Sequence, residues 1–355
     1  MRKISSEVLG VNPVSLGEQA GELHIYDNLS TPVSDDVIVL SEKHQKEIAD
    51  FAQMAAQQYG DRDGNREQTL AQRACGVPSL IVRVDATIHN GTIHAYEMED
   101  SPSGLGITDR IHRRMAGIGI RQIVHEHYIE TVGEVPKIVV SGKRGHGTDD
   151  EIIFGENYIY ERGDTTTLPE GEGPVIIKTI PGDSSSHEPY LGLQSRAVAP
   201  LVTEGDKSYL ERIGALKAAP AEDDLLIDSE GNLVSQVVKA RQGSMAMGVA
   251  LHLTSADRKR FTNQGTVTAS KLRKLRSDYE EHRGGALVQP FVPPIQIENK
   301  EGRKNAILRV FVLLGRKAVP ARVIGGCYVA RPPLLVHGAS DGVSGAVLVY
   351  NGEQS

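Results

Sequence analysis

Four ionisable side chains are spaced so that they could gather on one face of a two-stranded hairpin: Arg83, Asp85, Glu97 and Glu99. They lie in two strand-like runs, 78–88 ("PSLIVRVDATI") and 92–99 ("TIHAYEME"). Alternate residues of a strand point to the same face, so each run contributes two of these groups to one face. Three carboxylates beside an arginine form a set that could bind a divalent cation together with phosphate groups.

Whether the two pairs meet depends on the register of the hairpin, since a slip of one residue moves a side chain to the other face. A two-residue turn at Asn90-Gly91 would send Asp85 and Glu97 to opposite faces. A three-residue loop would instead set Asp85 opposite Glu97 and Arg83 opposite Glu99. The sequence therefore offers two hairpins, and only the second assembles a site.

The apolar residues of the hairpin favour the three-residue loop. In that register Val84 lies opposite Met98 and Ala86 opposite Tyr96, which leaves one face apolar and packed. The other face gathers the carboxylates, whose pKa values would rise unless a cation joined them. Mg²⁺ suits such hard oxygen ligands. A solvated hairpin face is the competing interpretation, and the spacing alone does not decide between them.

A second segment could bind phosphate. In residues 236–251 ("QVVKARQGSMAMGVAL") an apolar strand leads through Lys239 into a loop of small residues and then into another strand. Gly243 and Gly248 allow the backbone to approach a ligand closely, and the lysine would supply a point charge. The loop is neither a Walker loop nor a dinucleotide-binding fingerprint. A plain hairpin turn is the alternative for this segment taken by itself.

Length and composition limit the number of domains, the classes of partner and the expected location of the protein. The chain has 355 residues, enough for two or three subdomains, and a net charge of −7, which disfavours broad affinity for nucleic acid. No secretory signal and no apolar run long enough to span a membrane is found. Cys75 and Cys327 are the two cysteines. A reducing, cytoplasmic location is therefore expected.

The elements that must position these groups alternate along the chain. Helices are expected at 41–60, 106–133, 206–220 and 268–285, with Thr108 or Asp109 as a cap of the second. Residues 1–35 are expected to be irregular apart from a short strand near 22–27. Strands are expected at 136–142, 151–155, 173–180 and 197–202, and again at 233–240, 286–292, 306–315, 317–326 and 345–351. The fold class is therefore α+β with an α/β unit in the middle.

The order of these pieces resembles the ATP-grasp ligases. The helix 206–220, the strand and loop at Lys239, and the strands 287–292 and 308–315 follow one another as they do in that family. The family's metal-binding carboxylates ordinarily come last, whereas here the hairpin comes first. This order looks circularly permuted and is similar to glutathionylspermidine synthetase, whose hairpin reads R-x-D and, twelve residues after the Asp, E-x-N. The interval from Asp85 to Glu97 is also twelve residues.

The resemblance implies a role for each matching residue. Lys207 and Lys239 would hold ATP phosphates, and the loop Gln242, Gly243, Ser244 to Gly248 would cover them. Gln289, Phe291 and Val292 would line the adenine site. Asp85, Glu97 and Glu99 would hold Mg²⁺, and Arg83 and Arg309 would steady the transferred phosphate. Glu99 departs from the family pattern, which has Asn at that position.

The implied function is ATP-dependent ligation of a small-molecule carboxylate, an amino acid or peptide, to an amine through an acyl phosphate. The implied domains are an N-terminal segment 1–75, the permuted hairpin and helix 76–132, a pre-grasp-like α/β substrate domain 133–204, and nucleotide-binding subdomains 205–355. Lys178, Ser185 and Arg196 would recognise the substrate carboxylate. No nucleic acid or membrane partner is expected, and a homo-oligomer is compatible with the sequence. The alternatives are an enzyme that stops at phosphorylation and a degenerate nucleotide-binding or scaffold protein.

Overall fold

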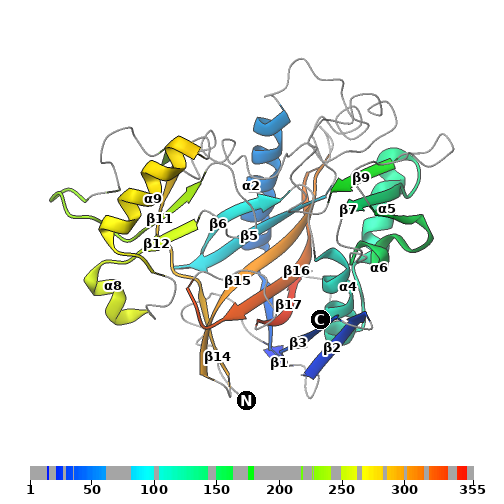
Figure 1. Ribbon diagram of the computed structural model, residues 1–355. Coiled ribbons are helices and arrows are strands. Elements are labelled where there is room, and N and C mark those ends of the chain that lie inside the picture. The colour runs from blue at the N-terminus through cyan, green and yellow to red at the C-terminus, as the bar shows by residue number, and fades with distance from the viewer. Residues whose placement is uncertain are drawn as a thin grey trace.

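The computed structural model describes residues 14–15, 21–26, 29–34, 36–60, 81–99, 104–142, 149–162, 175–179, 217–218, 226, 228–240, 249–261, 266–282, 286–299, 302–315, 320–334 and 342–349. These residues form three sheets with helices packed on them (Figure 1). The protein is thus mixed α and β, as the sequence predicts.

The central sheet has ten strands and carries most of the core. Its main path runs β1 (Val14–Ser15), β4 (Asp36–Leu40), β17 (Val343–Val349), β16 (Arg322–Arg331), β15 (Gly302–Leu313), β5 (Ile81–His89) and β6 (Thr92–Glu99). β14 (Ile295–Asn299) pairs with β15, and β2 (Gly21–Tyr26) and β3 (Leu29–Val33) join beside β17. The strand pairs are antiparallel except those of β17 with β3 and β4, which are parallel.

Two helices cover opposite faces of this sheet. α2 (Glu42–Gly60) packs its alanines against Val82, Val84 and Tyr328. α4 (Leu105–Ala116) packs Ile111 and Met115 against Cys327 and Ala346. Cys327 and Tyr328 are consecutive residues of β16, so they point to opposite faces and their helices do too. Arg83, Asp85 and Arg309 lie on the face that α4 shares.

The middle of the chain forms the expected α/β unit. Its three parallel strands run in the order β8 (Tyr158–Arg162), β7 (Lys137–Gly142) and β9 (Val175–Thr179). Residues 151–155, expected as a strand, belong instead to α6 (Asp150–Phe154) and to the short 3₁₀ turn η2 (Gly155–Asn157). An apolar run this short does not distinguish a strand from one buried helical turn.

The long helix expected at 106–133 is two helices, α4 and α5 (Arg121–Val132). Gly117, which has a φ of 73°, ends α4. Neither proposed residue caps α4: its first amides donate to the carboxylate of Asp149, from Gly106 at 2.8 Å and Ile107 at 3.2 Å. Asp109 accepts from the backbone N–H of Arg121 at 2.8 Å, so it holds the start of α5.

A separate four-stranded antiparallel sheet runs β10 (Lys217–Ala218), β13 (Ala286–Pro290), β11 (Gln236–Ala240) and β12 (Val249–His252). α9 (Ala269–His282) covers one face through Leu272 and Tyr279, and α8 (Ser255–Arg260) follows β12. β10 lies within the stretch predicted as the helix 206–220, so that prediction is wrong at residues 217 and 218. The rest of that stretch lies outside the described residues, as does the strand predicted at 197–202.

The N-terminal stretch is more regular than expected. The predicted strand near 22–27 is β2, but β1 and β3 flank it and were not predicted. No helix in the described ranges is long and apolar enough to cross a bilayer.

Candidate functional site

The hairpin that carries the carboxylates closes through a two-residue turn. Asn90 and Gly91 have φ values of 52° and 69°, and His89 pairs with Thr92. Both residues have the positive φ that a type I′ turn requires, which explains the Asn-Gly pair. The predicted three-residue loop is therefore wrong.

The predicted register at the carboxylates is nevertheless correct, because β6 contains a bulge. The ladder shifts between Asp85 and Ala86: Ala86 pairs with Ala95, while Asp85 pairs with Glu97. Tyr96 is the extra residue, so it does not oppose Ala86 as predicted. Beyond the bulge Arg83 pairs with Glu99. A bulge places two residues against one and so resets the register by one.

Arginines hold Asp85 from two sides. Arg83 donates from Nε to Oδ1 of Asp85 at 2.7 Å and from its terminal nitrogen to Oδ2 at 3.1 Å. Arg83 is only 2% exposed. Arg309, the cross-strand partner of Asp85 on β15, places Nε 3.8 Å from Oδ2, an ionic contact too long for a hydrogen bond. Arg309, Asp85 and Glu97 thus form one row across β15, β5 and β6.

The row fits a magnesium ion only in part. Asp85 and Glu97 are cross-strand partners on one face, whereas the side chain of Glu99 lies outside the described residues. Within the described ranges no cluster of three metal-ligating side chains is found. Mg²⁺ is commonly held by one or two carboxylates plus substrate phosphates, so two carboxylates suffice. A carboxylate offers about four acceptor positions, so Asp85 can accept from Arg83 and still ligate a cation.

Lys239 reaches this hairpin from the four-stranded sheet. It is buried on β11, and its ammonium donates to the backbone carbonyl of Tyr96 at 2.7 Å. The carbonyl belongs to the residue directly before Glu97. Lys239 therefore lies directly against the hairpin. Its charge is held next to the carboxylate row.

The segment expected to contact adenine lies beside Lys239. Gln289 opposes Val237 on β11, so it shares a face with Lys239, two residues along. Gln289 is buried, and its Oε1 has no hydrogen-bond partner. The backbone N–H of Phe291 donates to Ser235 at 2.9 Å, and the carbonyl of Val292 accepts from the Tyr96 hydroxyl at 3.0 Å.

A buried amide oxygen without a partner is unusual and is the kind of group that a ligand donor would satisfy. The Gln289 amide and the Lys239 ammonium together suit a purine base that continues into phosphates. The backbone N–H of Phe291 and the carbonyl of Val292 already have protein partners, so an adenine would have to use other groups of this segment or displace these partners.

The remaining predicted residues are not available for comparison. Lys207, Gln242, Gly243, Ser244, Gly248, Ser185 and Arg196 lie outside the described residues. Lys178 is a backbone member of β9, opposite Val140, and its side chain is likewise outside them. The phosphate loop and the substrate residues therefore stay predictions.

Two residues of the site escaped sequence reasoning. Tyr96 forms the bulge and contacts both Lys239 and Val292. The signal was present: a two-residue Asn-Gly turn and the register favoured by the apolar residues are compatible only if one residue bulges out. Cys327 extends the row beyond Arg309, with which it pairs. Burial raises the pKa of this thiol, so it stays protonated and is no nucleophile.

Comparison with known proteins adds little. No protein-family model matches the chain, and no curated protein matches it either. A crystal structure from Methylobacillus flagellatus KT, described as "Putative gamma-glutamylcysteine synthetase", aligns with 84% of this chain and 82% of its own at 11% identity and a TM-score of 0.39. A likeness this distant carries no argument about activity. The function has to be argued from the residues.

Proposed function

We propose that this protein is an ATP-dependent carboxylate–amine ligase with a circularly permuted ATP-grasp fold. One observation carries the proposal: a buried lysine of one sheet is held against a hairpin of another sheet, directly beside a row of carboxylates and arginines. This is the juxtaposition that a nucleotide lying between two sheets requires. The twelve-residue interval between Asp85 and Glu97 and the order of the elements support the same family.

The reaction has two steps. A substrate carboxylate oxygen attacks the γ-phosphorus of ATP, forming a C–O–P linkage as the bond to ADP breaks. An amine then attacks the carbonyl carbon, a C–N bond forms, and inorganic phosphate leaves with the C–O electron pair while the amine loses a proton. ATP, the carboxylate and the leaving phosphate are all anions, so catalysis consists mainly of positioning and charge neutralisation.

The residues of this chain divide that work. Lys239 and the arginines Arg83 and Arg309 would neutralise phosphate oxygens, and Asp85 and Glu97 would hold Mg²⁺. Bound there, Mg²⁺ would neutralise charge that develops between the phosphates. Arg83 also keeps the Asp85 carboxylate in place through its two hydrogen bonds.

We assign the substrate side to the α/β unit. The carboxyl ends of its three parallel strands form an edge of the kind where α/β sheets commonly bind ligands. Lys178, Ser185 and Arg196 are the proposed contacts for a small amino acid or peptide carboxylate. In this division residues 76–132 and 205–355 form the catalytic core, and 133–204 the substrate domain.

Calorimetric titration with Mg-ATP tests the proposal. Wild type should bind, and Glu97→Ala should bind at least ten-fold more weakly, because it removes one of the two described carboxylates. Glu42→Ala, at an exposed position at the start of α2, is the control and should bind as wild type does. Failure of the folded wild type to bind ATP, ADP or GTP would overturn the ligase function.

One observation favours a second candidate, a degenerate nucleotide-binding or scaffold protein. Asp85 and Lys239 both have partners within the protein, which would stabilise them even without a reaction. Phosphate release distinguishes the two. A ligase releases inorganic phosphate when a matching carboxylate and amine are supplied, whereas a degenerate protein binds Mg-ATP and releases none with any pair.

A further inference from the structure

The bulge residue Tyr96 contacts the four-stranded sheet through its backbone and the segment after β13 through its side chain. Its carbonyl accepts from the Lys239 ammonium at 2.7 Å, and its hydroxyl donates to the carbonyl of Val292 at 3.0 Å. On the neighbouring strand β5, two residues after Asp85, the hydroxyl of Thr87 donates to the carbonyl of Pro293 at 3.1 Å. These three hydrogen bonds join the hairpin to β11 and to the segment after β13.

The bulge bends β6 at the point where these contacts are made. In a regular ladder the carbonyls of β6 alternate between β5 and the outside of the sheet. A bulge leaves its extra residue out of the ladder and re-aims its side chain and carbonyl. Tyr96 is therefore released from pairing with β5 at the point where Lys239 approaches.

The consequence is geometric. Tyr96 directly precedes Glu97, so the carbonyl that holds Lys239 is covalently fixed to the carboxylate row. The same residue fixes Val292, which follows Gln289 at the expected adenine site. Burial raises the pKa of the Tyr96 phenol, so the hydroxyl stays a donor at physiological pH.

We propose that Tyr96 is a positioning residue for the nucleotide, which sets the Lys239 ammonium beside Asp85 and Glu97 through its carbonyl and orients the Val292 segment through its hydroxyl. The proposal rests on the proposed function for the identity of the ligand. The positioning itself is a property of the protein alone and can be measured without ATP.

A variant that lacks Tyr96 tests the effect of the bulge while it keeps the rest of the hairpin. Removal of this one residue leaves Ala86 opposite Ala95 and Asp85 opposite Glu97 in a regular ladder. The carboxylate row is kept, while the carbonyl before Glu97 then belongs to Ala95, in a ladder that lacks the bend by which the bulge aims the Tyr96 carbonyl at Lys239. Tyr96→Phe is the complementary variant, since it keeps the bulge and removes only the hydroxyl.

Two measurements test the role of the Tyr96 carbonyl and the role of its hydroxyl. Acetylation of Lys239 by acetic anhydride, followed by mass spectrometry, should be at least five-fold faster in the deletion variant and unchanged in Tyr96→Phe. The Kd for Mg-ATP should rise more than ten-fold in the deletion variant and about three- to ten-fold in Tyr96→Phe, the loss expected for one hydrogen bond. Tyr128→Phe, at a buried tyrosine packed on Phe154 beside the α/β unit, controls for general loosening and should change neither value.

The outcomes separate this inference from the proposed function. Unchanged Lys239 reactivity in the folded deletion variant, or an unchanged Kd in Tyr96→Phe, overturns the positioning role while leaving the ligase intact. If the wild type binds no nucleotide, the proposed ligase function is wrong. The acetylation rate of Lys239 still tests whether the bulge positions this lysine. Should the deletion variant fail to fold, Tyr96→Phe decides: an altered Kd together with a midpoint of thermal unfolding within about two degrees of the Tyr128→Phe control supports positioning.

Discussion

At the scale of single residues, the Arg83–Asp85 pair is the most strongly constrained feature of the site. Both groups are buried on β5, and both carboxylate oxygens of Asp85 accept from the guanidinium. Replacing Arg83 by Met would leave a buried carboxylate without its main partner, which costs about 3–5 kcal/mol of unfolding free energy. Urea denaturation measures this loss.

The exposed pair between Lys46 and Asp50 supplies the matched control. Lys46→Met should change the unfolding free energy by no more than about 1 kcal/mol, because water screens exposed ion pairs. Equal losses in Arg83→Met and Lys46→Met would show that Asp85 does not depend on Arg83.

A second residue links stability to pH. Burial lowers the pKa of His112 below its ordinary value of 6.5, against the opposing effects of the Gly326 carbonyl, Asp109 and the Val347 carbonyl. The unfolded state therefore binds a proton more readily than the folded state. The stabilising contribution is complete above pH 6.5 and is lost as pH falls towards the folded pKa.

We expect the free energy of unfolding to fall between pH 7 and pH 5, and the slope to be shallower in His112→Gln. Burial also lowers the pKa of His94, so this second histidine retains part of the slope in the variant. Chemical denaturation across this range measures both proteins. Identical slopes would contradict a role for His112.

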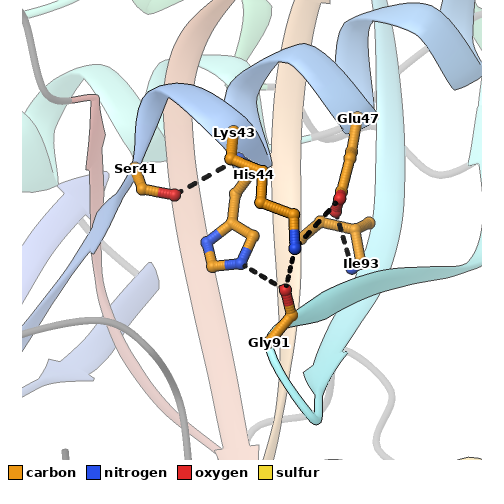
Figure 2. Close-up of polar contacts among 6 residues, drawn as sticks. All are labelled: Ser41, Lys43, His44, Glu47, Gly91 and Ile93. Atoms are coloured by element: carbon orange, nitrogen blue, oxygen red, sulfur yellow. Dashed lines mark hydrogen bonds and ion pairs between the residues drawn. The ribbon is translucent and has the colours of Figure 1, made fainter.

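At the scale of elements, the start of α2 holds the turn of the hairpin (Figure 2). Lys43 donates to the carbonyl of Gly91 at 2.7 Å, and the imidazole of His44 contacts the same carbonyl at 3.2 Å. Glu47 accepts from the backbone N–H of Ile93 at 3.0 Å. Three side chains within about one and a half turns of α2 thus hold one end of the hairpin, while the contacts of the bulge hold the other.

Glu47→Ala should loosen that end alone. The amide of Ile93 should exchange with solvent at least five-fold faster, since it loses the carboxylate acceptor, whereas the amide of Val84 in the middle of β5 should keep its rate. Hydrogen exchange followed by mass spectrometry resolves the two. Faster exchange at both sites would indicate that α2 supports the whole hairpin rather than its turn.

The hairpin also shows how far its sequence predicts its structure. The spacing of Arg83, Asp85, Glu97 and Met98 was sufficient to choose the register, because only one register separates charged from apolar side chains. The loop length inferred from it was wrong, since a regular ladder was assumed and Tyr96 bulges out. The Asn90-Gly91 pair is typical of the two-residue turn that the structure has, although the prediction favoured the longer loop, and the conflict between turn and register was the clue to the bulge.

Elements whose boundaries depend on distant contacts were harder to predict. The helix expected at 106–133 divides at Gly117, and its second half starts on a hydrogen bond from Arg121 to Asp109. The first half is capped by Asp149, far away in the sequence. The Asp149 cap is not visible in a local window of residues, because Asp149 becomes a neighbour of α4 only when the α/β unit packs beside it.

At the scale of the whole molecule, two sheets contribute to the site. The residues that each sheet contributes were predicted from the sequence, whereas the contact between the two sheets was not. Arg309 and Asp85 meet because β15 pairs with β5, and Lys239 reaches the same hairpin because the Tyr96 carbonyl accepts from its ammonium. The side chains are recognisable from residue type and spacing. Their meeting depends on pairings between strands more than 140 positions apart in the sequence.

A ligand that contacts both sheets should stabilise them together. Binding to the folded state adds about 2.7 kcal/mol to the unfolding free energy when the ligand is present at one hundred times its Kd. We therefore expect Mg-ATP to raise the midpoint of thermal unfolding of the wild type. Lys239→Met should show little or no increase, because it removes the charge that the four-stranded sheet contributes next to the carboxylate row.

Lys46→Met, at an exposed position of α2, should retain the full increase. Differential scanning calorimetry also reports whether the protein melts in one transition or two. With Mg-ATP bound, the wild type should melt in a single transition, whereas Lys239→Met should behave the same with and without the ligand. An increase of equal size in Lys239→Met and wild type would mean that the nucleotide binds without this lysine, and the assignment of Lys239 to the phosphates would then be wrong.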